Sequence, residues 1–217
     1  MPTKAKSPPK RTASKSERRI QLIDATIRCI ASHGLSDTTT SLVASEAGLS
    51  QGIINLHFKS KEKLLLATLE HVVDEYKSLW EKMYAQAGPS TEEKLLALVG
   101  VDFHPSVCER DKLAVWFAFW SESKARPTYR KLCADRDREY DRLINRLCAS
   151  LVVEGGYALD PVQVANALTA MTEGLWLDML VNSREMSRQQ AKQTTLAYLT
   201  HVFPDHIKQP QPERKTA

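Results

Sequence analysis

Residues 35–60, LSDTTTSLVASEAGLSQGIINLHFKS, hold two short helical patterns separated by only a few residues. Thr39 or Thr40 can cap the first helix, and Ser50 can cap the second, because a hydroxyl accepts a hydrogen bond from a free amide of the first turn. Gly48 supplies the turn between them, since glycine adopts positive φ at little cost. A helix, a tight glycine turn and another helix form the helix-turn-helix layout.

The second helix of this pair has an apolar side and a polar side. Its apolar residues are Ile53, Ile54 and Leu56, of which Ile53 and Ile54 are expected to pack inward together with Phe58. The residues left to point outward are Ser50, Gln51, Asn55 and His57. Gln and Asn side chains can bond adenine through two hydrogen bonds, and Gly52 allows close backbone approach. This polar side therefore predicts a helix that reads bases in the major groove of DNA.

Three lysines, Lys59, Lys61 and Lys63, follow at the start of the next helix. Positive charge there opposes the helix dipole, which favours anions at an N-terminus. Phosphates lying against the free amides would offset this repulsion. The alternative interpretation is a solvated cluster of charges.

The rest of the chain shows helical periodicity throughout. A long helix begins at Lys61 and ends before Gly88, and further helical patterns cover residues 91–103, 111–124, 128–152, 161–182 and 187–202. No alternating strand pattern competes with them. We therefore expect an all-α chain: a basic arm without order (1–15), a three-helix DNA-binding domain (16–60), a larger helical bundle (61–204) and a tail without order (205–217).

Charge and cysteine content narrow the class of protein. The net charge is +4, but the first 20 residues alone contribute +6, so a basic arm precedes a slightly acidic body. Such an arm fits a polyanion partner or a tail that only aids solubility. The four cysteines are scattered, which predicts free thiols and no metal site. No signal peptide, membrane-spanning stretch, phosphate-binding glycine loop or nucleophile motif occurs, so we expect a cytoplasmic protein that is not an enzyme and needs no cofactor.

Residues 17–65 resemble the N-terminal domain of the TetR family of bacterial repressors. The resemblance includes the glycine after the first helix, the threonine-rich cap, the Ala-Gly-Leu-Ser turn and the His-Phe-Lys-x-Lys ending. One departure is that Asn55 and Leu56 stand where the family usually has aromatic residues. The resemblance implies a homodimer that places each recognition helix in one half of an inverted-repeat operator in double-stranded DNA. The residues predicted to contact DNA are Thr39, Thr40, Ser50, Gln51, Gly52, Asn55, His57, Lys59 and Lys63.

Two later segments, 101–123 and 171–183, resemble the C-terminal domain of the choline-responsive, BetI-type repressors of glycine betaine synthesis. The shared pattern is Trp-x-Ala-Phe-Trp in one helix and an acidic residue followed by Gly-Leu-Trp-Leu in another. This resemblance implies a small-molecule inducer, namely choline or a related quaternary ammonium compound. The alternative is a TetR-type regulator of efflux or catabolism that senses another lipophilic cation or an aromatic ligand.

The aromatic residues of these segments suit a cation. A quaternary ammonium has no N–H donor, so aromatic faces and carboxylates must recognise it. Trp116 and Trp120 are four residues apart and share one helical face, whereas Phe117 and Phe119 leave that face. The predicted ligand-binding residues are Phe103, Trp116, Trp120, Glu173 and Trp176, with Asp102 and Asp178 as further carboxylates. Packing in the core or at a dimer interface is the alternative for these rings.

The last two helical patterns are the predicted dimer faces. They carry apolar residues suited to a paired helix bundle, namely Val164, Leu168, Met171, Leu175, Leu196, Leu199 and Val202.

Overall fold

The computed structural model describes residues 14–208, apart from the side chains of residues 135–137. Within that range the chain forms nine α-helices and no strand, which confirms the all-α prediction. They are α1 (Lys15–Asp37), α2 (Thr40–Glu46), α3 (Gly52–Phe58), α4 (Lys61–Gln86), α5 (Thr91–Asp102), α6 (Arg110–Glu122), α7 (Pro127–Gly155), α8 (Pro161–Val181) and α9 (Arg188–Val202).

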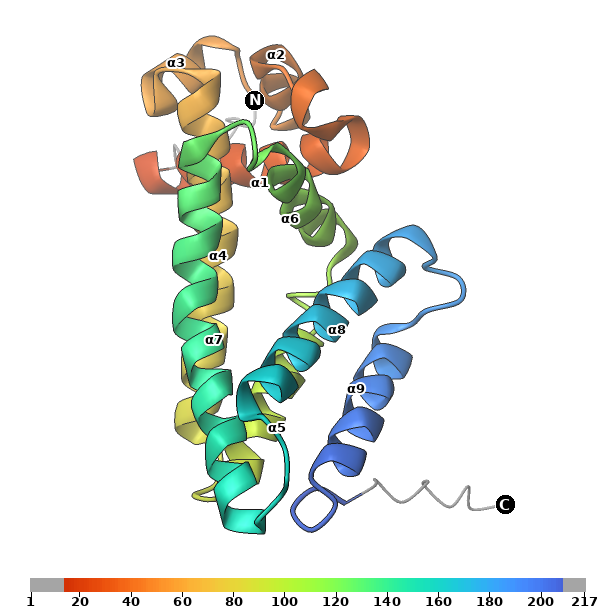
Figure 1. Ribbon diagram of the computed structural model, residues 1–217. Coiled ribbons are helices and arrows are strands. Elements are labelled where there is room, and N and C mark those ends of the chain that lie inside the picture. The colour runs from red at the N-terminus through yellow and green to blue at the C-terminus, as the bar shows by residue number, and fades with distance from the viewer. Residues whose placement is uncertain (1–13, 209–217) are drawn as a thin grey trace, which may run out of the picture.

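The helices form a small head and a larger body (Figure 1). Helices α1, α2 and α3 make the head, and α4 runs from the head down through the body beside α7. Helices α8 and α9 pack against each other on the other side of the body, and α6 lies between body and head, where it packs on α1. Helix α4 is therefore a continuous rod that joins the two parts.

Serine side chains fix where several of these helices begin. Ser14 and Glu17 form a capping box at α1, and Ser90 and Ser187 do the same at α5 and α9. Ser60 caps α4 by accepting a hydrogen bond from the amide of Lys63. These caps satisfy amides that have no partner inside the helix, which is worth about 1 kcal/mol each.

The first helix ends differently from the prediction. The sequence pattern, in which His33-Gly34 is a plausible C-cap, predicts an end at Gly34, and the backbone does leave helical values there, with φ 77°. One more turn follows, however, and the helix continues to Asp37 across this kink. The side chain of Thr38 stabilises the turn by donating to the carbonyl of Gly34 over 2.7 Å.

The predicted arm and tail lie mostly outside the described residues. At the arm's edge, Lys15 already belongs to α1. At the start of the tail, Ile207 is buried and the ring of His206 is 3.0 Å from the Tyr157 hydroxyl. Residues 206 and 207 are thus packed against the body.

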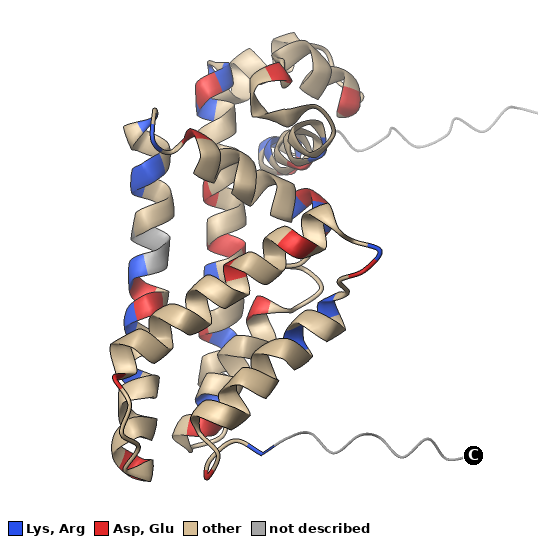
Figure 2. Ribbon diagram, turned by 45° about the vertical axis from the view of Figure 1, so that its right-hand side comes forward, with Lys and Arg blue, Asp and Glu red and all other residues tan. Residues whose placement is uncertain are grey.

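Charged residues are distributed unevenly over the body. Lys and Arg follow one side of α7, whereas α8 shows few charged residues (Figure 2). None of the described helices is both long and apolar enough to cross a bilayer.

Candidate functional site: a DNA-reading head and an acidic aromatic cavity

The turn between α2 and α3 has a geometry that only glycine adopts readily. Gly48 has φ 64°, its amide donates to the carbonyl of Ser45, and the amide of Leu49 donates to that of Ala44. This pair of hydrogen bonds is the Schellman motif, which ends a helix sharply. The turn therefore fixes the angle at which α3 leaves α2.

Helix α1 holds α3 in place from behind. The guanidinium of Arg19 lies over the ring of Phe58, 4.4 Å from its centroid, and also donates to the carbonyl of His57. Gln21 donates from its amide to the carbonyl of Ala47, over 2.8 Å. Ile54 and Phe58 are buried against this support. The outer side of α3 is therefore presented on a fixed backbone.

Most of the predicted DNA-contacting residues lie on the open surface of the head. The exposed ones are Thr39, Ser50, Gln51, Gly52, Asn55, Lys59 and Lys63, while Thr40 and His57 are half-buried. Thr39 caps α2, and the side-chain amide of Gln51 donates to the hydroxyl of Thr40 over 3.3 Å.

The prediction that Ser50 caps α3 is wrong. Gln51 occupies the N-cap position, and its side chain does not accept a hydrogen bond from the first turn of α3. Ser50 accepts from the amide of Ile53 through its backbone carbonyl instead.

The lysines after α3 divide into two kinds. Lys59 is the C-cap residue of α3, and its backbone is in the left-handed region with φ 67°. Its side chain therefore does not continue the helical arrangement of the side chains before it. Lys61 donates from its ammonium to the carbonyl of Ser36, which ties α4 to the end of α1. Lys59 and Lys63 remain exposed at the edge of α3, where phosphates would lie if α3 entered a groove.

A small cavity lies in the body between α4, α5, α7 and α8. Its walls are Tyr76, Asp102, Tyr140, Asp141, Ile144, Leu168, Thr169, Thr172, Glu173 and Trp176. The cavity volume is about 30 Å³, which is room for about two waters. Three aromatic side chains and three carboxyl groups thus line a small, partly open space.

Asp102 is the centre of this wall. It is 4% exposed, and its Oδ1 accepts hydrogen bonds from Tyr76 over 2.6 Å and from Tyr140 over 2.8 Å. Two donated hydrogen bonds favour the carboxylate over the protonated acid. Burial, followed by the nearness of Asp102, raises the pKa of the Tyr140 hydroxyl well above its usual value. Tyr140 therefore remains a donor at neutral pH.

The position of Asp102 places a carboxyl group at the C-terminal end of a helix, in one wall of the cavity. It is the last residue of α5, where the helix dipole already places partial negative charge. The backbone carbonyl of Asp102 also accepts from the indole of Trp176, over 2.8 Å, and from the thiol of Cys108. A buried carboxylate at the C-terminal end of a helix does not stabilise the helix, but it stabilises a cation placed beside it.

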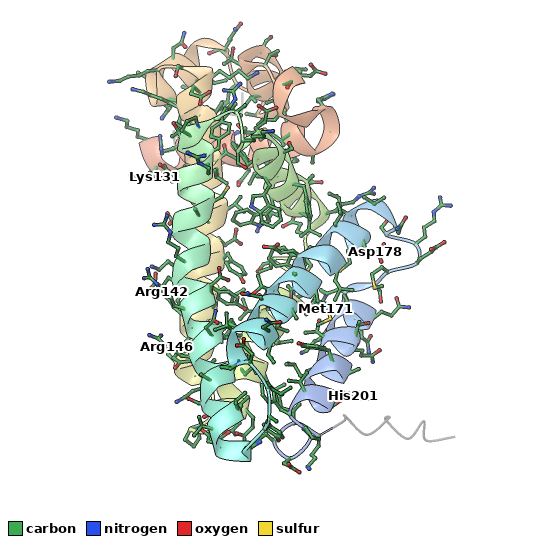
Figure 3. All side chains as sticks on the ribbon, viewed as in Figure 1. Lys131, Arg142, Arg146, Met171, Asp178 and His201 are labelled. Atoms are coloured by element: carbon green, nitrogen blue, oxygen red, sulfur yellow. The ribbon has the colours of Figure 1, made fainter. Side chains whose placement is uncertain are left out.

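No Lys or Arg belongs to the described lining of the cavity, in which Asp141 and Glu173 are the other charged residues. Three basic side chains of α7, those of Lys131, Arg142 and Arg146, extend outward from the body (Figure 3).

One hydroxyl in the cavity wall has no partner. Thr172 is buried, and its Oγ1 is the only such side-chain atom without a hydrogen bond among the described residues. Buried polar groups are nearly always paired, so a water or a ligand group in the cavity is the expected partner of this hydroxyl.

The structure brings together only part of the predicted ligand set. Trp176 and Glu173 both line the cavity. Trp116 is buried and lines a smaller neighbouring cleft with Lys112, whose ammonium lies 2.7 Å from Glu75. Trp116 therefore lies in a different cleft, which shares Tyr76 with the cavity.

The two remaining predicted rings pack elsewhere. Trp120 is half-buried, 6.2 Å from Trp116 and edge-on to Phe117. Phe103 is buried, and its carbonyl accepts from Arg188. Neither belongs to the lining of the cavity between α4, α5, α7 and α8.

Sequence reasoning missed the two tyrosines of the cavity. The ring of Tyr76 lies 5.6 Å from that of Tyr140 and 6.1 Å, edge to face, from that of Trp176. Both tyrosines stand at inward positions of long helices, where they look like ordinary core residues. The available signal was the hydroxyl, because a buried tyrosine needs a hydrogen-bond partner.

The outer side of α8 carries a stripe of exposed residues at alternating spacings of four and three. They are Gln163, Ala167, Ala170, Gly174, Leu177 and Val181. A Cβ at Gly174 would meet nothing within 4 Å. Val164, Leu168 and Leu199, which we predicted for a dimer face, are instead buried in the core of their own chain.

The four cysteines are unbonded thiols, and among the described residues no group of three His, Cys, Asp or Glu could hold a metal ion.

Two family models match the chain. Residues 22–68 match the bacterial regulatory proteins of the tetR family, and residues 91–204 match the C-terminal domain of BetI-type transcriptional repressors. The HTH-type transcriptional regulator BetI of Burkholderia thailandensis is 38% identical over 163 residues, which cover 74% of this chain and 80% of that protein.

Solved structures show the same fold. A transcriptional regulator from Pseudomonas aeruginosa PAO1 has a TM-score of 0.76 at 25% identity, over 89% of this chain and 93% of that one. A transcriptional regulator from Saccharomonospora viridis, solved in complex with choline, has a TM-score of 0.73 at 27% identity, over 86% of this chain and 97% of that one. The chain belongs to the TetR family of bacterial regulatory proteins and carries the C-terminal domain of its BetI-type repressors.

Proposed function

We propose that this chain is a dimeric transcriptional repressor that binds an inverted-repeat DNA operator and is controlled by choline or a closely related quaternary ammonium compound. The observation that carries the choice of ligand is the cavity in which Tyr76, Tyr140 and Trp176 surround the buried Asp102. The choline complex of the Saccharomonospora viridis regulator supports the same choice.

Each part of choline has a partner in this cavity. Aromatic faces attract a trimethylammonium group by about 0.5–2 kcal/mol each, depending on desolvation. Asp102 and Glu173 supply the negative charge that three rings alone do not, and the hydroxyl of Thr172 is placed to bond the hydroxyl of choline. A neutral aromatic ligand, the alternative class, would gain nothing from the negative charge of Asp102 and Glu173.

The cavity is smaller than choline, so ligand binding must move its walls. Tyr76 belongs to α4, which continues into the head, and Trp176 belongs to α8. A ligand that binds more tightly to an opened arrangement shifts the protein toward that arrangement. We propose that this shift moves the two recognition helices away from the spacing of the operator, with α4 as the connecting element.

The ligand proposal predicts a marked preference for choline over glycine betaine. Glycine betaine has the same trimethylammonium group but adds a carboxylate, which Asp102, Asp141 and Glu173 would repel. We expect calorimetric titration to give choline at least about tenfold tighter binding, a difference of roughly 1.4 kcal/mol. No heat from choline at millimolar concentration, with folded protein, would contradict the proposal. Tighter binding of an uncharged aromatic compound would favour the alternative class.

The DNA proposal rests on the outer side of α3. The major groove admits one helix, and Gln51 and Asn55 are exposed where base edges would lie, with Lys59 at the phosphate edge. Replacing these three residues by alanine together should reduce affinity for the operator at least about a hundredfold, since lost base contacts cost roughly 1–3 kcal/mol each. A fluorescence-anisotropy titration measures this change.

The control for the triple variant is its choline titration and its sedimentation. Both should match the unmodified protein, because α3 contacts neither the cavity nor α8. Retained operator affinity in a folded triple variant would show that another surface reads the DNA.

The stripe on α8 supports the dimer. Its spacing of four and three keeps one face of a helix against a partner helix, and its small residues allow close approach. Gly174 has no contact within its own chain that would require a glycine, but a second helix packed over it would. We propose that α8 and α9 of two copies form a four-helix interface.

A further inference from the structure

Leu56 is the most prominent apolar side chain on the head. It is 71% exposed, although a leucine normally gains from burial. Ile54 and Phe58 anchor the other side of α3 in the core. At about 100° per residue, Leu56 lies about 180° from the mean direction of these two anchors. Its side chain therefore stands at the outermost line of the helix.

Gly52, one turn earlier, lies on nearly the same line. A Cβ at this position would meet nothing within 4 Å, and its φ is not in the left-handed region. The isolated chain therefore has neither a packing reason nor a backbone reason for a glycine here, although glycine weakens a helix. An exposed leucine and an unneeded glycine on the same line indicate that a neighbour approaches α3 closely at this point.

The surroundings identify the chemistry of that neighbour. Leu56 is flanked by the exposed polar Asn55 and followed by the exposed Lys59 and Lys63, a pattern that suits base edges with phosphates beside them. A partner protein would favour an apolar ring around the leucine. In the major groove, only thymine presents an apolar group, its C5-methyl.

We propose that Leu56 reads one thymine in each half of the operator by packing against its C5-methyl group, and that Gly52 provides the clearance for this contact. The proposal rests on the DNA-binding function proposed above and adds a base preference to it. The contact is apolar, so it requires no hydrogen bond from the leucine and none from the base.

Deoxyuridine gives a direct test, because it differs from thymidine only in lacking this methyl group. The probe is a duplex selected for binding from a random-sequence pool, in which each symmetric pair of thymines is replaced by deoxyuridine in turn. For the unmodified protein, replacing one of these thymine pairs by deoxyuridine should weaken binding about fourfold per half-site, which is the value of one buried methyl group. The two half-sites together then give a loss of about fifteenfold. Leu56→Ala should weaken binding to the thymine duplex similarly and lose the difference between the two duplexes.

The matched control is Val153→Ala, because Val153 is an equally apolar side chain, 81% exposed on α7 and away from the head. It should retain the full thymine preference. An equal thymine-to-deoxyuridine ratio in the unmodified protein and Leu56→Ala would overturn the proposal. So would a change in the sedimentation of Leu56→Ala without a change in that ratio, since this would assign Leu56 to a protein contact. If the unmodified protein selects no duplex at all, the DNA-binding function itself fails.

Discussion

Asp102→Asn should weaken choline binding about a hundredfold or more while leaving the protein dimeric and folded. The amide has nearly the same shape as the carboxylate, and its Oδ1 can still accept from both tyrosines, but it removes the buried charge that a cation requires. Breaking a buried charge pair by removing one partner costs roughly 3–5 kcal/mol, which corresponds to this loss or a larger one. Isothermal titration calorimetry measures the change.

A neutral ligand of the same shape makes this experiment specific to charge. In 3,3-dimethylbutan-1-ol a carbon atom replaces the nitrogen of choline, so Asp102→Asn should change its weak binding little. Asp178→Asn is the matched carboxylate control, because Asp178 is on α8 (Figure 3) but does not line the cavity. Equal losses for choline and for its carbon analogue would show that Asp102 acts through structure and not through charge. Should Asp102→Asn unfold, Glu173→Gln tests the same charge argument at a half-buried position.

Ala170→Arg should convert the protein into monomers and thereby strongly weaken operator binding. Ala170 lies in the middle of the exposed stripe on α8, between Ala167 and Gly174, where a partner helix would leave no room for a long charged side chain. A dimer binds two half-sites at once, so a monomer loses the gain from the second contact, about a hundredfold to ten-thousandfold in affinity. Sedimentation velocity and operator titration measure the two effects.

The matched control places the same side chain elsewhere on the body. Ser150→Arg introduces an arginine at an exposed position of α7, and it should leave both the dimer and operator binding unchanged. If the Ala170→Arg variant remains dimeric, the proposed interface is wrong and the dimer forms through another face.

The sequence determines the helices of this protein better than it determines the cavity. Helical periodicity is a local signal, and it placed α5, α6, α8 and α9 within about one or two residues of their observed ends. The cavity is formed by Tyr76, Asp102, Tyr140 and Trp176, which come from four helices and meet only in the folded chain. Nothing local marks them as neighbours.

The aromatic residues of α6 show the same limit of sequence-based prediction. A spacing of four residues correctly indicates that Trp116 and Trp120 share a helical face, and their rings do lie together. It does not indicate which way that face turns, and α6 turns it toward the cleft with Lys112 rather than toward Asp102. Glu173 and Trp176 lie at the cavity because α8 turns the face that carries both toward α5.

The hydrogen bonds around Asp102 also bear on how much ligand is needed before the protein responds. Tyr76, Tyr140 and Trp176 tie α4, α7 and α8 to the end of α5, and a cavity of this size must open before choline enters. The apparent dissociation constant is the intrinsic one divided by the fraction of molecules that are open. The strength of these hydrogen bonds therefore sets the threshold concentration of choline at which the protein responds. Substitutions that never touch the ligand can raise or lower this threshold, while the groups that recognise the cation stay the same.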